Sequence, residues 1–436
     1  MSMSAAFTTS GPLVTSRRPW ARLSLRLWHR LLSAGRGDVA EFRGWERAIQ
    51  WRAYTTPQER RLAVRRAVKL PLRAVREARA DVQAFGSEVT AATGVSRRRQ
   101  LLQLWWLKVR YGIKGRSYLA FQLYRPDRWR RAGEYVQEGE FNRVGRYMRA
   151  HLWRDAAETF WGRRRFEQLC REHAIPTVPT LVEFAEGRIS ETTLPDGVLP
   201  PCDLFSKPTE STGGEGAARW LYDGRGGYTG RDGRTRTSAE LLEELAELSR
   251  QPGPKSDEPR SVLLKECVRN HASLLPLTPG GLCTARIETY RLPGGTPRYL
   301  LGVYKMPAND AAADNFRFGG VIAPIDESTG RLGPGVFKVG KLLTTVTDHP
   351  TTGTRIEGHQ LPWWREAVDL VLRAHAVIPV IGLVGWDVAL RDDGPVIIEG
   401  NSIPSAELAQ EASGVPLGAT PLMACLNAHL RSHMQG

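Results

Sequence analysis

The sequence predicts an α+β fold that follows a basic, mainly helical N-terminal domain. From about residue 155 onward, apolar runs of strand length alternate with Gly- and Pro-rich turns and short helical patterns, as in mixed α and β domains. The preceding residues instead show apolar side chains at three- and four-residue spacing with few strand signals. A chain of 436 residues is long enough for two or three domains.

The charge is divided unevenly along the chain. Residues 1–150 carry 31 Lys or Arg against 11 Asp or Glu, a net charge of +20, and the rest carry 30 against 35, a net charge of −5. The same third holds seven of the 13 tryptophans. We therefore expect an anionic partner for this domain, either a membrane surface or a nucleic acid. A plainer interpretation is that Arg favours helices and Trp fills a core.

Helix boundaries are readable in this basic region. Thr56, Pro57 and Glu59 form a typical helix start, because the threonine side chain can cap the backbone while the glutamate caps in return. Pro71 should then kink or divide the helix, since it lacks a backbone donor.

Two classes of protein are excluded by composition. No stretch approaches the roughly 18 uncharged apolar residues of a membrane-spanning helix. The five cysteines lie far apart without a CxxC pair, so neither a disulfide framework nor a zinc finger fits. We expect a cytoplasmic protein, peripheral to a membrane if the basic domain binds lipid. The segment before Asp38 lacks acidic residues, as transit peptides do, but we treat it as part of the mature chain.

A lysine followed by a flexible loop suggests phosphate binding. The apolar segment "CDLFSKP" ends with Lys207, and a Gly-rich loop follows at once. Glycine lets backbone N–H groups approach phosphate oxygens, and the ammonium adds a positive charge. A Gly-rich surface hairpin is the alternative, since no P-loop motif is present. The loop residues that we expect at the phosphates are Ser211, Thr212, Gly213, Gly214 and Gly216.

A second candidate site lies near the C-terminus in "GWDVALRDDGPVIIEGNSIPS". The turn at residues 392–394 should join two apolar strands, so that Asp387 on one strand meets Glu399 and Asn401 on the other. Two carboxylates and an amide oxygen are suitable ligands for Mg²⁺. Because Glu399 follows an apolar run, we expect it to be buried against a cation.

Together these segments resemble the ATP-grasp superfamily, in particular the sugar-transfer associated ATP-grasp or alpha-L-glutamate ligase-related group. The resemblance runs from roughly Phe160 to Ser405 and includes "LFSKPTESTGGEG", "ECVRNH", "TARIETY", "DNFRFGG", "APIDESTGRLGP", "HPTTG" and "GWDVAL…IIEGNSIPS". It implies an ATP-grasp fold in which two α+β subdomains grip ATP. It also implies activation of a carboxylate as an acyl phosphate, which an amine then attacks.

The resemblance assigns roles to residues of the nucleotide site. Lys207 looks like the lysine that reaches the phosphates, with the Gly213–Gly216 loop as a lid. The backbone at Lys265, Glu266 and Cys267 is similar to the hinge that pairs with adenine, with His271 near the base or ribose. Asn315 and Arg317 would line the same cleft, and Arg163 would replace an upstream lysine that reaches the α-phosphate.

It also assigns the metal and the catalytic cations. Asp387, Glu399 and Asn401 match the magnesium ligands. Arg286 and Lys305, together with Lys207, would offset charge on the transferring phosphoryl group. Several ligases of the superfamily place a catalytic arginine two residues before the aspartate, where this chain has Gly385.

The sequence thus predicts three segments: a basic, Arg- and Trp-rich helical domain at 1–150, a small ATP-grasp subdomain with the phosphate lid at 151–265, and a large subdomain with the magnesium site at 266–436. The predicted function is an ATP- and Mg²⁺-dependent, ADP-forming carboxylate–amine ligase with small-molecule or peptide substrates. Two alternatives stay open: a kinase on the same fold, and a nucleic-acid or membrane-surface adaptor with a degenerate ATP unit. Neither the substrates nor the oligomeric state can be read from the sequence.

Overall fold

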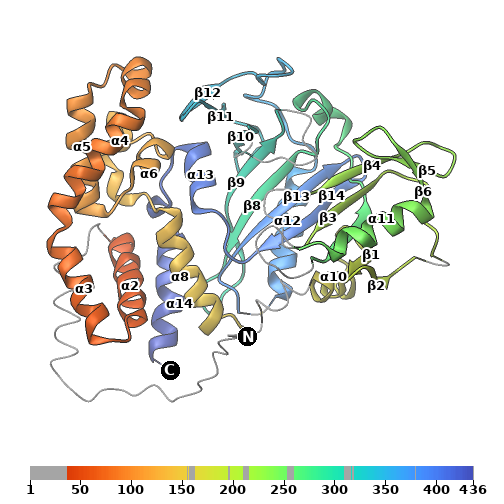
Figure 1. Cartoon of the computed structure of the whole chain (residues 1–436), viewed down its shortest axis with the longest axis horizontal. Helices are drawn as coiled ribbons and strands as arrows, with labels where there is room; N and C mark the ends of the chain where they lie inside the picture. Colours follow the sequence, from red (N-terminus) through yellow and green to blue (C-terminus); the bar gives the residue numbers. More distant parts are fainter. Residues whose placement is uncertain are drawn as a thin grey trace.

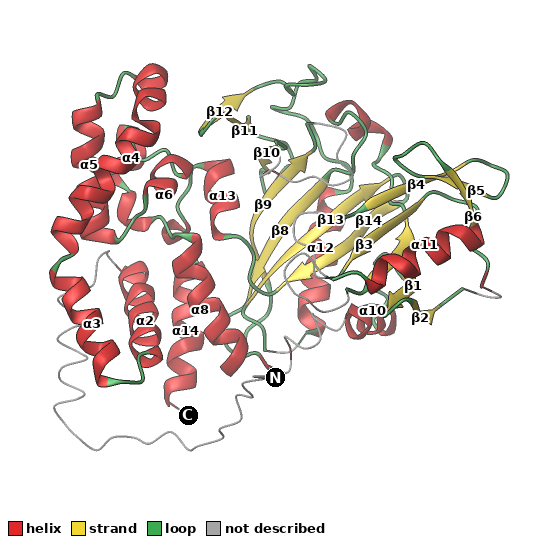
Figure 2. Cartoon of the chain, in the orientation of Figure 1, coloured by secondary structure: helices red, strands yellow, loops and turns green. Residues whose placement is uncertain are grey.

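The computed structural model contains two β-sheets with a helical region beside them (Figure 1). Figure 2 shows that the helices of the first third of the chain gather on one side, with the strands on the other. The structure describes residues 37–154, 156, 163–194, 197–209, 216–252, 260–308, 316, 319–378 and 380–435.

The described part of the N-terminal region is helical, which confirms the prediction. The helices are α2 (Gly37–Ala53), α3 (Pro57–Val68), α4 (Leu70–Thr93), α5 (Arg97–Tyr111), α6 (Gly115–Ala120), α7 (Pro126–Arg130), the 3-10 turn η1 (Ala132–Glu134), α8 (Glu138–His151) and α10 (Arg163–Glu172). Buried side chains of α4, α5 and α6 form a core of their own that includes Phe85, Leu104 and Tyr118, whereas those of α2, α8 and α10 join the core of the second sheet.

The predicted boundaries around α3 are also confirmed. The Thr56 side chain accepts a hydrogen bond from the Glu59 N–H, and the Glu59 carboxylate accepts one from the Thr56 N–H. Helix α3 ends at Val68, and Pro71 lies in the first turn of α4. The proline therefore divides the helix where its missing N–H costs least.

The first sheet has seven strands in the order β2-β1-β7-β3-β4-β5-β6, all antiparallel to their neighbours. They are β1 (Thr180–Ala185), β2 (Arg188–Thr192), β3 (Leu204–Pro208), β4 (Ala218–Tyr222), β5 (Gly227–Thr229), β6 (Thr235–Thr237) and β7 (Val262–Glu266). Helix α11 (Ser238–Arg250) covers one face through Leu241 and Leu245, which pack with Leu204 and Leu264. Side chains alternate along a strand, so Lys207 points to the opposite face.

The second sheet also has seven strands, in the order β12-β11-β10-β9-β8-β13-β14. They are β8 (Thr284–Tyr290), β9 (Arg298–Met306), β10 (Val321–Pro324), β11 (Gly335–Val339), β12 (Leu342–Val346), β13 (Leu383–Arg391) and β14 (Gly394–Asn401). The remaining elements are the 3-10 turns η3 (Ala272–Leu277) and η5 (Leu417–Ala419) and helices α12 (Trp364–Val377), α13 (Ala406–Ser413) and α14 (Leu422–Gln435). The predicted hairpin at 392–394 is confirmed as the turn between β13 and β14.

The N-terminal helices pack against the end of the chain. Helix α14 lies beside α2, where Asn427 donates to the Asp38 carbonyl and Arg431 pairs with Glu41 at 2.7 Å. On α13, the Gln410 side chain exchanges two hydrogen bonds with the backbone of Val136. The helical region and the second sheet therefore share a continuous apolar core.

Among the described residues, none of the helices is both long enough and apolar enough to cross a lipid bilayer.

Candidate active site

A cavity of about 220 Å³ lies between the first sheet and the β14 edge of the second. A parallel bridge between Thr177 and Ile397 joins the two sheets beside it. The lining residues are Arg149, Phe166, Glu167, Thr177, Lys207, Lys265, Ile398, Glu399, Gly400, Asn401, Ser402 and Ile403. The volume of the cavity and its charged lining residues suit a polar ligand between the two sheets.

Lys207 and Glu399 make contact across the two sheets. The Lys207 Nζ lies 3.2 Å from Glu399 Oε2, and the Asn401 amide donates to Glu399 Oε1 at 3.3 Å. In the sheet register Asp387 is directly opposite Glu399, as the hairpin predicts. The structure thus brings the lysine, both acids and the amide into one cluster.

Glu399 is half-buried and contacts a cation, whereas we expected it to be buried against one. Its side chain is 41% exposed, whereas that of Asp387 is 9% exposed. The apolar run before Glu399 belongs to an edge strand, so the face that carries Glu399 opens toward the cavity rather than into a core.

Asp387 is held by two cations from the same sheet. Arg286 Nε and Nη2 donate to the two carboxylate oxygens at 2.7 and 2.8 Å, and Lys305 Nζ lies 3.1 Å from Oδ1. Arg286 pairs with Asp387 in the register of β8 and β13, so the sheet itself sets this geometry. Arg286, Lys305 and Asp387 are not among the residues that line the cavity, but Asp387 lies opposite Glu399 on the neighbouring strand.

Neighbouring cations determine the protonation states of Asp387 and Glu399. Burial would raise the pKa of Asp387, but Arg286 and Lys305 outweigh it and hold the pKa well below its usual range. Burial also acts against the charge on Glu399, and Lys207 lowers its pKa overall. Both carboxylates are therefore ionised near neutral pH.

Lys265 contributes its side chain to the cavity. Its Nζ lies 2.6 Å from Glu167 Oε1 on α10 and donates to the Val178 carbonyl at 2.8 Å. Glu167 also accepts from the hydroxyl and the N–H of Thr180. This network ties α10 to β1 and β7 at the cavity wall.

The predicted adenine contacts of the hinge stay a prediction, although part of its backbone is bonded within the protein. The Cys267 N–H donates to the Asp203 carbonyl at 2.8 Å, and Lys265 lies on β7 with strands on both sides. These backbone groups are already used within the protein, since a central strand is bonded on both edges. Glu266 pairs with Leu204, on the face opposite Lys207.

His271 is also placed away from the cavity. It caps η3, with its Nδ1 accepting from the Ser273 N–H, and its Nε2 lies 3.9 Å from Asp392 at the hairpin turn. The cavity borders the opposite end of β14, so the structure does not bring His271 to the ligand.

Most of the predicted lid lies outside the described residues, as do Ser211, Thr212, Gly213, Gly214, Asn315, Arg317 and the side chain of Arg163. Gly216 is described and has a φ of +74°, a left-handed conformation that favours glycine.

The packing around Gly385 explains why this position holds glycine and not an arginine. A Cβ at this position would lie 2.6 Å from the Pro404 Cβ, so Pro404 leaves no room for an arginine here.

Glu288 lies opposite Gly385 on the neighbouring strand β8, two residues after Arg286. Glu288 is buried, and burial raises its pKa to about 7, with Arg286 opposing the shift and Glu138 adding to it.

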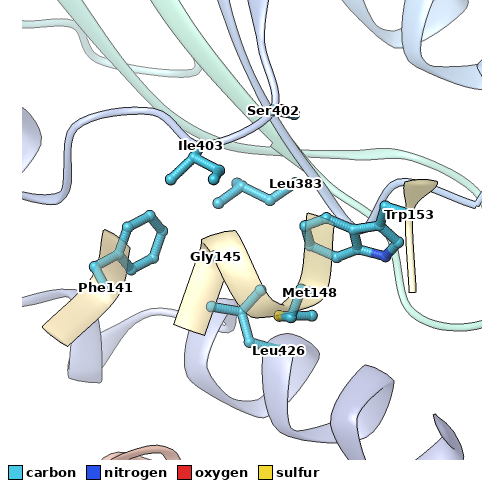
Figure 3. A pocket seen from close by; sticks show the side chains of 8 residues that line it. All are labelled: Phe141, Gly145, Met148, Trp153, Leu383, Ser402, Ile403 and Leu426. Atoms are coloured by element: carbon cyan, nitrogen blue, oxygen red, sulfur yellow. The ribbon is translucent and has the colours of Figure 1, made fainter. Parts of the chain in front are cut away.

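Helix α8 packs closely on the segment that follows Asn401. A Cβ at Gly145 would lie 2.9 Å from Ile403, so glycine permits the approach. Figure 3 shows Ile403 and Leu383 pointing toward α8 around a void of about 10 Å³, which is about one water in size. From the same helix, Arg149 lines the main cavity.

Residues 142–420 match the family described as sugar-transfer associated ATP-grasp. This chain belongs to that family. The match begins within α8, earlier than the expected start near Phe160, so the ATP-grasp match includes Gly145 and Arg149.

Several solved structures are also similar to this chain. A D-alanine–D-alanine ligase from Bacillus anthracis complexed with ATP is 13% identical, with 64% of this chain and 68% of that chain covered and a TM-score of 0.34. The Coxiella burnetii D-alanine–D-alanine ligase is 12% identical, with 64% and 60% covered and a TM-score of 0.36. Carboxyaminoimidazole ribonucleotide synthase from Aspergillus clavatus is 12% identical, with 57% and 46% covered and a TM-score of 0.30. A search of curated proteins gave no match.

The cavity wall of this ATP-grasp protein offers oxygen ligands for a metal ion. Within the described part of the chain, no group of three or more His, Cys, Asp or Glu side chains is arranged to hold a metal. The predicted set consists of two carboxylates and the Asn401 amide, and such oxygen donors suit Mg²⁺. Glu399 and Asn401 border the cavity, while the oxygens of Asp387 already accept from Arg286.

Sequence reasoning missed four polar residues of the site: Arg149, Glu167, Thr177 and Ser402. Arg149 and Glu167 belong to helices without a motif, and Thr177 lies in a connecting segment before β1. The available signal was weak: Glu167 is an acid in an otherwise basic "RRRFEQL" helix, which suggests an internal partner.

Proposed function

We propose that this ATP-grasp protein is an ATP- and Mg²⁺-dependent carboxylate–amine ligase that releases ADP and phosphate. One observation carries the proposal: a Lys207–Glu399 contact joins the two sheets beside the cavity, and Glu399 lies opposite Asp387, which pairs with Arg286 and Lys305. Phosphoryl transfer depends mainly on such positioned charge.

In the proposed reaction a substrate carboxylate oxygen attacks the γ-phosphorus, and the bond from that phosphorus to the β–γ bridging oxygen breaks. This gives an acyl phosphate and ADP. The amine nitrogen then attacks the acyl carbon, the bond from that carbon to the phosphate oxygen breaks, and the ammonium loses a proton. The products are an amide and phosphate.

The chain's own residues would position and neutralise the reacting groups. Lys207 would contact the transferred phosphoryl group, exchanging its present contact with Glu399 for one with phosphate. Arg286 and Lys305 would offset negative charge behind it, since Asp387 holds both cations in place. Glu399 and Asn401, which border the cavity, would hold Mg²⁺, which neutralises phosphate charge when bound.

Product analysis tests the reaction class. The protein is incubated with ATP, Mg²⁺ and a panel of carboxylic acids, with hydroxylamine as a general amine that traps acyl phosphates as hydroxamates. We expect ADP, phosphate and a hydroxamate. AMP and pyrophosphate would contradict the acyl-phosphate route, and a stable phosphorylated product without hydroxamate would indicate a kinase.

A binding measurement separates an active nucleotide site from a degenerate one. ATP with Mg²⁺ should raise the melting temperature, because a ligand that binds only the folded state stabilises it. Lys207→Ala should reduce this shift, whereas Lys341→Ala, which removes an exposed lysine beside β12, should retain it. Equal shifts in both variants would contradict the role of Lys207.

A further inference from the structure

Helix α3 and the start of α4 expose an apolar stripe that nothing in the ATP-grasp site uses. Val64, Val68 and Leu72 are 37%, 76% and 79% exposed. Val64 and Val68 lie in α3, and Leu72 lies in the first turn of α4. The Lys69 N–H donates to the Arg65 carbonyl and the Arg73 N–H to the Lys69 carbonyl, so helical spacing continues across the junction and places the three side chains along one side. The opposite side faces the protein, where Ala74 is buried and Leu70 is half-buried. We call Val64, Val68 and Leu72 the α3 stripe.

The α3 stripe is surrounded by positive charge. Between Glu59 and Glu77 there are seven basic residues and no acidic one. These are Arg60, Arg61, Arg65, Arg66, Lys69, Arg73 and Arg76. Arg61, Arg65 and Lys69 are exposed, and on a helical projection they fall beside the stripe.

Among the residues that the structure describes, the position of α3 leaves this surface accessible. Figure 1 shows α3 at the outer edge of the helical region, on the side away from the two sheets. A flat surface could therefore approach the stripe while the cavity between the sheets stays open to its ligands.

We propose that the α3 stripe docks the protein on an anionic lipid surface. An in-plane helix binds such a surface by inserting apolar side chains among the acyl chains while Arg and Lys contact the headgroups. The charge and the stripe are both used in this arrangement. A nucleic-acid backbone would satisfy the cations but would leave Val68 and Leu72 in water. The proposal does not depend on the proposed ligase reaction.

Vesicle co-sedimentation of the full chain tests the proposal. The probes are vesicles of phosphatidylcholine alone and of phosphatidylcholine with phosphatidylglycerol, at low salt and at about 0.5 M salt. We expect binding to the anionic vesicles only, with weaker binding at high salt. The double variant Val68→Glu/Leu72→Glu should bind about tenfold more weakly or worse, because it places two charges in the inserted face. The triple variant Arg61→Gln/Arg65→Gln/Lys69→Gln should also lose about tenfold or more, since each cation near the surface contributes.

A control places one exposed Val→Glu substitution elsewhere. Val198 is 64% exposed on a loop between β2 and β3, and Val198→Glu should bind vesicles like the parent protein. All substituted side chains are exposed, so circular dichroism and melting should show intact folding.

Three results would overturn the proposal. The first is equal binding of the parent and the stripe variant to anionic vesicles. The second is salt-sensitive binding to RNA with no binding to vesicles, which would assign the charge to a nucleic acid. The third is a dimer of the parent that the stripe variant dissociates, which would make the stripe an interface between two copies.

Discussion

The two sheets present their charged residues to the site in different ways. In the second sheet, Asp387 is buried and both of its cations, Arg286 and Lys305, come from neighbouring strands of the same sheet. In the contact between the sheets, Lys207 and Glu399 come from different sheets and are 20% and 41% exposed. The first cluster is therefore built into the fold, whereas the second depends on how the sheets meet. We therefore expect the Arg286–Asp387–Lys305 cluster to keep its geometry, and the Lys207–Glu399 contact to change when a ligand binds.

Asp387→Asn is expected to have the largest effect on stability. It leaves Arg286 and Lys305 close together without their counter-ion, and breaking a buried ion pair from one side costs about 3 to 5 kcal/mol. Urea unfolding would measure this loss. If the free energy of unfolding changed by less than about 1 kcal/mol, the cluster would not be a structural unit.

Glu288→Gln should change how stability depends on pH. Burial raises the pKa of Glu288 from 4.5 to about 7, so between these values the folded protein keeps a proton that the unfolded chain has lost. The free energy of unfolding of the parent therefore falls as pH rises through this window, by about 3 kcal/mol in total. Near pH 8 the glutamine variant should be more stable than the parent, and near pH 4 the difference should be small.

The control for this measurement is Glu366→Gln, which removes an exposed acid in the first turn of α12. Its melting temperature should follow the parent's pH profile. A Glu288→Gln profile that also runs parallel to the parent would show that Glu288 is not protonated in the folded state.

Glu399→Gln should have the smallest effect on stability and a large effect on ligand binding. The Lys207–Glu399 pair is partly exposed, and such pairs contribute less than about 1 kcal/mol. We expect nearly parental urea unfolding but loss of the thermal protection by ATP with Mg²⁺. A variant as unstable as Asp387→Asn would contradict the distinction between the two contacts.

Local patterns predicted those parts of the site that short segments determine. The turn at 392–394 sets the register of its own hairpin, so Asp387 could be placed opposite Glu399 from sequence. The capping pair Thr56 and Glu59 likewise marked the start of α3. Such features depend on residues a few positions apart.

Predictions failed where the environment of a strand was decided at a distance. The apolar run before Glu399 suggested burial, but β14 is an edge strand beside the cavity. The hinge role of the "LLKECV" segment stays a prediction, and only the tertiary structure shows that the Lys265 side chain reaches the cavity.

The sequence by itself determined the basic helical region, the strand-rich remainder, the lysine at the end of β3 and the acids of the β13–β14 hairpin. Charge distribution, periodicity and turn residues are local properties, so they can be recognised in the sequence without knowledge of the tertiary structure. Only the tertiary structure decided that Lys207 meets Glu399 across 192 positions, that Pro404 fills the space beside Gly385, and that α8 brings Arg149 to the cavity. These contacts depend on how sheets and helices pack, and packing is set by the whole chain.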